Sequence, residues 1–214
     1  MSNHLTIAVI TAAIQELVQV AVQKVRPGAI VRVGPPRPVA PCTEEVDIYL
    51  YQISPNAQLR NDDLPQRAAD GMLTRQPTAA IRLHYLIAFA GEDQLATETM
   101  LGCVVSVLHA LPVLTGKELG AIVSARGSHP YLQESDLPYQ QERVKLTPEY
   151  LSLDELSKLW TVFFQLAHRP SLQYVVSPVL IDMDLRPFKT PPVCRVDSSV
   201  ERDGDNEVGR YQAP

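Results

Sequence analysis

The amino-acid sequence predicts a single α+β domain over residues 1–185, with a mixed sheet flanked by helices, and a C-terminal arm over residues 186–214. Stretches with helical spacing of apolar residues alternate with stretches of period two, and there is no internal repeat. The 214 residues are 45% hydrophobic and 20% charged, which is typical of a globular chain with a core. Beyond residue 185 apolar side chains are sparse and the charges cancel.

A helix is predicted first, over residues 7–25, and Pro27 and Gly28 end it. Its apolar residues recur at helical spacing: Ile7, Ile10, Ile14, Leu17, Ala21 and Val25. A short strand is expected at 29–33. Residues 35–41 contain four prolines, so they form an extended loop rather than the interior of a sheet.

Two longer strands are expected at 46–53 and 79–89, because apolar residues alternate in both. In the second strand the side opposite the apolar face starts with Arg82 and His84 and ends with Leu86 and Ala88. We therefore expect that end of the strand to be covered on both sides. The segment between the strands, residues 54–78, is long and polar, and such connections tend to be functional.

Helices are the main elements predicted for the second half of the chain. One is predicted around residues 101–111, and two Ser/Thr-x-x-Glu capping boxes, Thr115 with Glu118 and Ser152 with Glu155, start two more. A strand at 142–146 and a last strand at 174–184 complete the sheet. Pro178 cannot donate to a ladder, so the last strand either lies at a sheet edge or carries a bulge there.

The composition argues against several functional classes. With 19 basic and 24 acidic residues the net charge is -5, which does not favour nucleic-acid binding. The three cysteines are far apart and read as reduced thiols of a cytosolic protein, and the five histidines are too dispersed for a metal site. No GxSxG, HExxH or GxGxxG motif is present, and Thr115-Gly116-Lys117 lacks the upstream glycine of a phosphate loop. We expect no catalytic residue, cofactor or metal.

Membrane insertion is not expected either. The apolar run at residues 5–14 lacks a basic start and is interrupted by Gln15 and Glu16, so it reads as a folded helix rather than as a signal peptide. No stretch reaches the about 18 apolar residues of a membrane span.

Seven residues are candidates for contacts with other proteins. Four lie in the mixed-charge loop, where a solvated surface is the alternative: Arg60, Asp62, Asp63 and Arg67. Lys158 and Trp160 belong to the helix that follows Ser152, and Trp160 reads as a core residue or a subunit contact. Phe188 lies in the arm. Ordering a backbone costs about 1–2 kcal/mol of free energy per residue, whereas burying a large side chain returns about 1.5–3 kcal/mol. With so few apolar side chains the arm cannot order itself, so we expect it to lie on a neighbour. The alternative is a frayed tail without a role.

Several motifs together resemble the tail-terminator, or cap, family of extracellular contractile injection systems, which are phage-tail-like particles. The resemblance covers about residues 4–185. It rests on Arg60-Asn61, Asp63-Leu64-Pro65, Leu101-Gly102 and residues 48–56 (IYLYQISPN), 83–86 (LHYL), 143–148 (RVKLTP), 151–160 (LSLDELSKLW) and 177–181 (SPVLI).

The resemblance implies a structural protein similar to contractile-phage tail terminators. Such caps form a hexameric ring that ends the inner tube distal to the baseplate and contacts the last sheath layer. The implied partners are copies of the chain itself, the tube protein and the sheath protein. Assembly is expected in the cytoplasm, on a particle released from the cell or docked at a membrane. A baseplate or adaptor component and a small hydrolase or nucleotide-binding enzyme remain as alternatives.

Overall fold

The computed structural model describes most of the chain up to residue 182. The described residues are 3–40, 43–59, 66–67, 73–75, 78–125, 130–140, 143–164 and 166–182. Cys42, Cys194, Phe188 and the remainder of the arm lie outside them.

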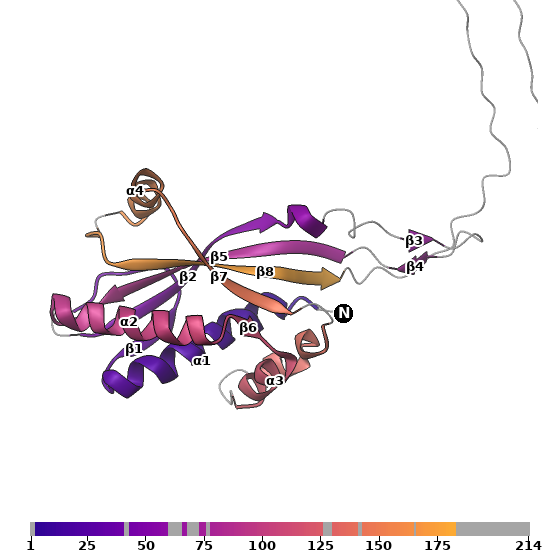
Figure 1. Cartoon of the computed structure of the whole chain (residues 1–214), viewed down its shortest axis with the longest axis horizontal. Helices are drawn as coiled ribbons and strands as arrows, with labels where there is room; N and C mark the ends of the chain where they lie inside the picture. Colours follow the sequence, from indigo (N-terminus) through magenta and orange to yellow (C-terminus); the bar gives the residue numbers. More distant parts are fainter. Residues whose placement is uncertain are drawn as a thin grey trace, which may run out of the picture.

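A six-stranded sheet in the order β1-β2-β5-β8-β7-β6 forms the centre of the molecule (Figure 1). Its strands are β1 (Ile30–Val33), β2 (Glu45–Pro55), β5 (Thr78–Ala90), β6 (Val113–Leu114), β7 (Val144–Glu149) and β8 (Ser171–Asp182). β1 pairs with β2 in parallel, and all other neighbours are antiparallel. The mixed sheet expected from the sequence is confirmed.

Three helices cover one face of this sheet and the fourth covers part of the other (Figure 1). The first three are α1 (Thr6–Val25), α2 (Gln94–Ala110) and α3 (Gly116–Ala125), which share the main core with β2, β5, β7 and β8. α4 (Leu153–Thr161) lies on the opposite side. Short 3-10 turns occur at Ala57–Leu59, Pro130–Glu134 and Leu137–Tyr139.

α1 is a core helix, as its apolar spacing predicted. Val9, Ile10, Ile14 and Val18 are fully or almost fully buried in the main core. Within the described chain it is the one helix long and apolar enough to cross a membrane, but 56% of that stretch is buried inside the protein. Such burial is typical of the core helix of a folded domain.

Both capping boxes are present where the sequence predicted them. Thr115 Oγ1 accepts from the Glu118 N–H at 3.4 Å, and Glu118 Oε2 accepts from the Thr115 N–H at 2.8 Å. Leu114 and Leu119 beside them are 2% exposed. α3 therefore starts at the predicted position because its first turn satisfies its own donors.

For Pro178 the sequence left two alternatives, a sheet edge or a bulge, and the position of β8 contradicts the first. The strand lies inside the sheet, between β5 and β7, and not at its edge. Ile81 of β5 is opposite Val179, whereas Leu83 is opposite Val176, so two residues of β8 face one residue of β5. The bulge offered as the other explanation is confirmed, and it places the proline where no ladder donor is needed.

Three short strands were not predicted. β6 adds two residues to the sheet beside β7, and β3 (Gln66–Arg67) pairs with β4 (Leu73–Arg75) within the segment expected to be a loop. α2 also begins earlier than its apolar pattern indicated, at Gln94, because the Asp93 carboxylate accepts from the Ala96 N–H at 2.7 Å and caps the helix.

Candidate interaction surface

α4 carries the main candidate surface, and its N-terminus is fixed by a complete capping box. Ser152 Oγ accepts from the Glu155 N–H at 3.3 Å, while Glu155 Oε2 accepts from the Ser152 N–H at 2.9 Å. These hydrogen bonds with Ser152 lower the pKa of Glu155. The box sets the start of the helix and so decides which side chains point toward the sheet.

The inner side of α4 packs on the sheet through aromatic rings. Trp160 and Phe163 form a second core with Leu86 and Ala88 of β5. The Trp160 and Phe163 ring centroids are 5.5 Å apart at 70°, and Phe163 meets Tyr49 of β2 at 5.6 Å and 71°. These edge-to-face arrangements stabilise the contact beyond the buried area alone. The expectation that this end of β5 is covered on both sides is confirmed.

The outer side of α4 and the residues after it are apolar but uncovered. Leu153 is 82% exposed and Phe164 is 84% exposed. Together with the rim of the second core they line a groove of about 790 Å³, formed by Leu153, Leu156, Ser157, Trp160, Thr161, Phe163, Phe164, Leu166 and His168. Two phenylalanines and a tryptophan in one open groove mark a site where another protein segment can bind.

Trp160 contributes an unsatisfied donor at this groove. Its Nε1 is buried and has no hydrogen-bond partner among the described residues, although the ring of His168 lies 5.1 Å away between centroids. Buried donors are nearly always paired, so an unpaired one at the wall of an open groove calls for an explanation.

A polar network lies on the same face of the sheet, farther along β5. Ser54 Oγ is 2.8 Å from His84 Nε2, and His84 Nδ1 is 3.0 Å from Glu149 Oε2. Tyr51 donates to the same Glu149 oxygen at 3.3 Å. Burial and the negative charge of Glu149 raise the pKa of Tyr51 to about 12, so its hydroxyl stays protonated.

The order Ser54, His84, Glu149 has the connectivity of a serine–histidine–acid triad. A triad also needs a pocket that holds the substrate at the hydroxyl and donors for the oxyanion. The α4 groove and a second cavity beside α2 are lined neither by Ser54 nor by His84. Its hydrogen bonds join β2, β5 and β7 on this part of the face, and we refer to the network as the polar clamp.

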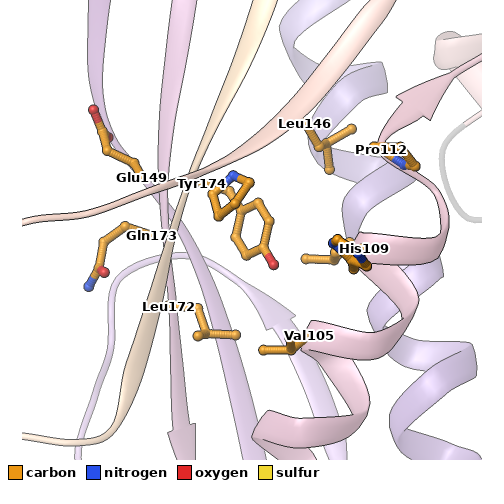
Figure 2. Close-up of a pocket in the computed structure, with 10 residues that line it drawn as sticks. Val105, His109, Pro112, Leu146, Glu149, Leu172, Gln173 and Tyr174 are labelled. Carbon is orange, nitrogen blue, oxygen red and sulfur yellow. The ribbon is translucent and has the colours of Figure 1, made fainter.

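The second cavity lies on the other face, between α2 and strands β7 and β8. It has a volume of about 220 Å³, and His109 and Tyr174 contribute its inward polar groups (Figure 2). Figure 2 shows Glu149 and Gln173 on the opposite side of the strands from Tyr174, so these groups cannot act together with His109. Burial raises the pKa of Tyr174, which keeps its phenol neutral. The cavity offers no nucleophile with an adjacent base.

A buried cluster of charges closes the end of the sheet near β1. Asp47 of β2 is fully buried, and its Oδ1 accepts from Arg32 Nη2 at 2.6 Å. Arg32 also pairs with Glu45, and Arg37 lies 3.5 Å from the same carboxylate. Burial raises the pKa of Asp47, against the effect of Arg32. The arginines thus hold a carboxylate whose charged form burial disfavours.

The structure describes only some of the predicted interface residues. Lys158 is exposed on α4 and donates to Asp154 at 2.6 Å, and Trp160 is 6% exposed, as expected for a core residue. Arg60, Asp62, Asp63 and Phe188 lie outside the described residues. For Arg67 the structure gives only its backbone place in β3.

Sequence reasoning did not single out the exposed apolar residues or the polar network. Leu153 and Phe164 belong to runs in which helical spacing alone cannot separate the core side from the outer side. Ser54, His84 and Glu149 come from three strands, and only the sheet register brings them together. No group of His, Cys, Asp and Glu in the described part of the chain could hold a metal ion.

Comparison with known proteins identifies a family. The family model described as the Pvc16 N-terminal domain matches residues 9–195. No match was found among curated proteins.

Two solved structures share the fold. One is the sheath/tube terminator of PVC, an extracellular contractile injection system, in its extended state, with a TM-score of 0.58, 19% identity and coverage of 94% of this chain and 65% of that one. The other is the tube-terminating cap of the anti-feeding prophage, with a TM-score of 0.56, 18% identity and coverage of 89% and 60%. The chain thus spans less than two thirds of the length of either structure.

Proposed function

The chain belongs to the Pvc16 N-terminal domain family, and we propose that it is a structural cap, or tail terminator, of a contractile injection system. It ends the inner tube and the sheath at the end distal to the baseplate. The observation that carries this proposal is the fold shared with two terminator structures over 94% and 89% of this chain.

The proposed role is not enzymatic. The described residues offer an open apolar groove on α4 and a half-buried polar clamp at His84, and Ser54 lines neither the groove nor the cavity beside α2. Such a surface suits protein–protein contacts better than chemistry. No cofactor or metal enters the proposal.

The partners we propose are further copies of the chain, which form a ring matched to the tube, together with the tube protein and the sheath protein. A ring requires a heterologous interface whose rotation closes. In solution the chain is monomeric or weakly associated, and the tube templates closure. Assembly takes place in the cytoplasm, and the cap remains part of the particle.

We assign two segments to these contacts. The loop at residues 54–78, with Arg60, Asp62, Asp63 and Arg67, is an interface element of the ring or the tube. The domain ends near residue 185, and residues 186–214 form an arm that lies on a neighbour. Truncation after Leu185 tests the arm, because a truncated chain that still caps tubes and retains sheath as well as the full chain removes this assignment.

Deletion of the gene from a particle-producing strain tests the function itself. Tubes without a terminator keep growing or lose sheath, so electron microscopy should show tubes of irregular length or tubes without stable sheath. Re-expression of the full chain should restore uniform particles. Uniform, fully sheathed particles in the deletion strain would mean that another protein terminates them, and a label on this chain at the baseplate end would point to a baseplate or adaptor component.

A further inference from the structure

The apolar groove on α4 has no occupant in the chain that the structure describes. Its outer residues Leu153 and Phe164 are among the most exposed large apolar side chains of the protein. A leucine and a phenylalanine this exposed beside a groove of about 790 Å³ are typical of a binding site. The chain also has a segment that needs a binding site, residues 183–214.

That segment begins at the end of β8 that lies far from α4 (Figure 1). α4 packs on Leu86 and Ala88, which pair with Gln173 and Ser171 at the start of β8. β8 then runs away from α4 to Asp182. The end of β8 at Asp182 and the groove therefore lie at opposite ends of one protomer.

The distances favour a groove on another copy over the protomer's own groove. Nine residues of strand separate Gln173 from Asp182, which corresponds to about 30 Å at the usual rise of a strand. Six residues separate Asp182 from Phe188, and a fully extended chain covers at most about 20 Å with them. The extended chain to Phe188 is thus about 10 Å shorter than the strand that it would have to retrace, so the corresponding groove on another copy is the favoured site.

The chemistry of the two partners is complementary. Phe188 is the first aromatic residue of the arm, and the groove presents the rings of Trp160, Phe163 and Phe164. Aromatic pairs and a central aromatic anchor are typical of the strongest interface contacts. Arg186 and Lys189 flank Phe188, and the exposed acidic residues Asp154 and Glu155 lie in the first turn of α4.

From these observations we infer that Phe188 of one copy binds in the α4 groove of the adjacent copy. The inference rests on the proposed ring and names the contact that links its subunits. A groove at one end and its ligand at the other end form a heterologous interface, which is the kind that closes a cyclic ring. The arm thus acts as a strap from each subunit to the next.

Disulfide cross-linking in assembled particles tests this contact. In a background of C42S, C103A and C194S, one chain carries Phe164→Cys and a second, longer tagged chain carries Phe188→Cys. Mild oxidation of particles built from both chains should give the mixed dimer. Leu95→Cys replaces Phe164→Cys as the control, because Leu95 is also exposed, at 73%, but lies on α2. The control should give no mixed dimer.

Absence of the mixed dimer in particles that contain both chains would overturn the inference, and so would only an intrachain disulfide when one chain carries both cysteines. A cross-link from Phe188→Cys to the sheath protein instead of the groove would also overturn it. As a second readout, Phe164→Asp and Phe188→Asp should each remove the ring from most tube ends, whereas Leu95→Asp should leave it. Retention of the ring by both aspartate variants contradicts the contact.

The same particles separate this inference from the proposed function. Gold labelling of the wild-type chain reports its position independently of the cysteines. A wild-type chain at the distal end without the mixed dimer disproves the strap and leaves the cap role intact. A wild-type chain absent from the distal end disproves the cap role.

Discussion

Arg169 Nη1 lies 3.6 Å from Asp47 Oδ2, and this contact joins the segment before β8 to the start of β2. The Arg169 Nη2 group also donates to the Arg37 carbonyl oxygen at 2.7 Å. Arg169 therefore fixes the described part of the proline-rich segment, residues 35–40, against the sheet at Arg37. Burial lowers the pKa of Arg169, against the effect of Asp47, but the guanidinium remains charged.

Arg169→Met should destabilise the domain by about 3 kcal/mol, because it leaves a buried carboxylate with one charged partner fewer. Urea denaturation at pH 7 measures the loss of unfolding free energy. Arg143→Met, at an exposed position before β7, is the matched control and should cost less than about 0.5 kcal/mol.

The loss caused by Arg169→Met should depend on pH in a defined direction. The pKa of Asp47 is already raised in the folded protein, and removal of Arg169 raises it further. The folded variant therefore binds a proton more readily than the unfolded chain does, and its stability falls as pH rises through that raised pKa. The difference from wild type should grow between about pH 4 and pH 7. A difference independent of pH would mean that Asp47 does not carry the effect.

Ser54→Ala tests whether the clamp at His84 is structural. Among the described residues the hydroxyl has one hydrogen-bond partner, His84 Nε2, so its loss should cost about 1 kcal/mol of stability. Hydrolysis of p-nitrophenyl acetate should be equal in the variant and the wild type, because Ser54 lines neither the α4 groove nor the cavity beside α2. Wild-type turnover clearly above that of Ser54→Ala would revive the hydrolase alternative.

The long loop is tested by charge reversal. Arg60→Glu with Arg67→Glu should weaken assembly of the ring or its binding to the tube, because both arginines are proposed to lie at an interface. The thermal midpoint of the isolated protein should not change. Lys24→Glu with Lys117→Glu makes the same charge change at exposed positions on α1 and α3 and should assemble normally. Normal particles from the arginine variant would mean that the loop is exposed to solvent and is not an interface element.

The capping box of α4 should respond to acid. Glu155 has a lowered pKa, so its contribution is complete above the ordinary glutamate pKa and is lost as pH falls through the lowered value. The wild type should be more stable than Glu155→Ala at pH 7, and the gap should narrow at about pH 3. Glu155→Gln keeps the reach of the side chain and should show less dependence on pH. An equal gap at both pH values would rule out the charged form as the capping group.

The sequence predicts this fold well wherever the signal is local. α1, α3, α4 and the two long strands follow from apolar spacing and from capping boxes that lie within a few residues. β6 and the β3–β4 pair are too short to show a period, and their pairing depends on partners supplied by the rest of the sheet. Pro178 shows the same limit, since the proline indicates a disrupted ladder but not where the strand lies in the sheet.

The candidate surface was less predictable. Trp160 and Phe163 share one apolar helical face, and the structure buries both, but Phe164 directly after them points outward. Alternation of buried and exposed aromatics at the end of a helix depends on how the next segment turns. The resemblance of separate motifs to a cap family supplied the proposed function, which neither composition nor periodicity could have named.

Cryo-electron microscopy of the distal particle end tests the central claim most directly. Particles that carry this chain should show a sixfold ring of its density on the last tube layer, in contact with the last sheath layer, and particles from the deletion strain should lack that ring. A distal end with threefold density from this chain, or with none, would contradict the account.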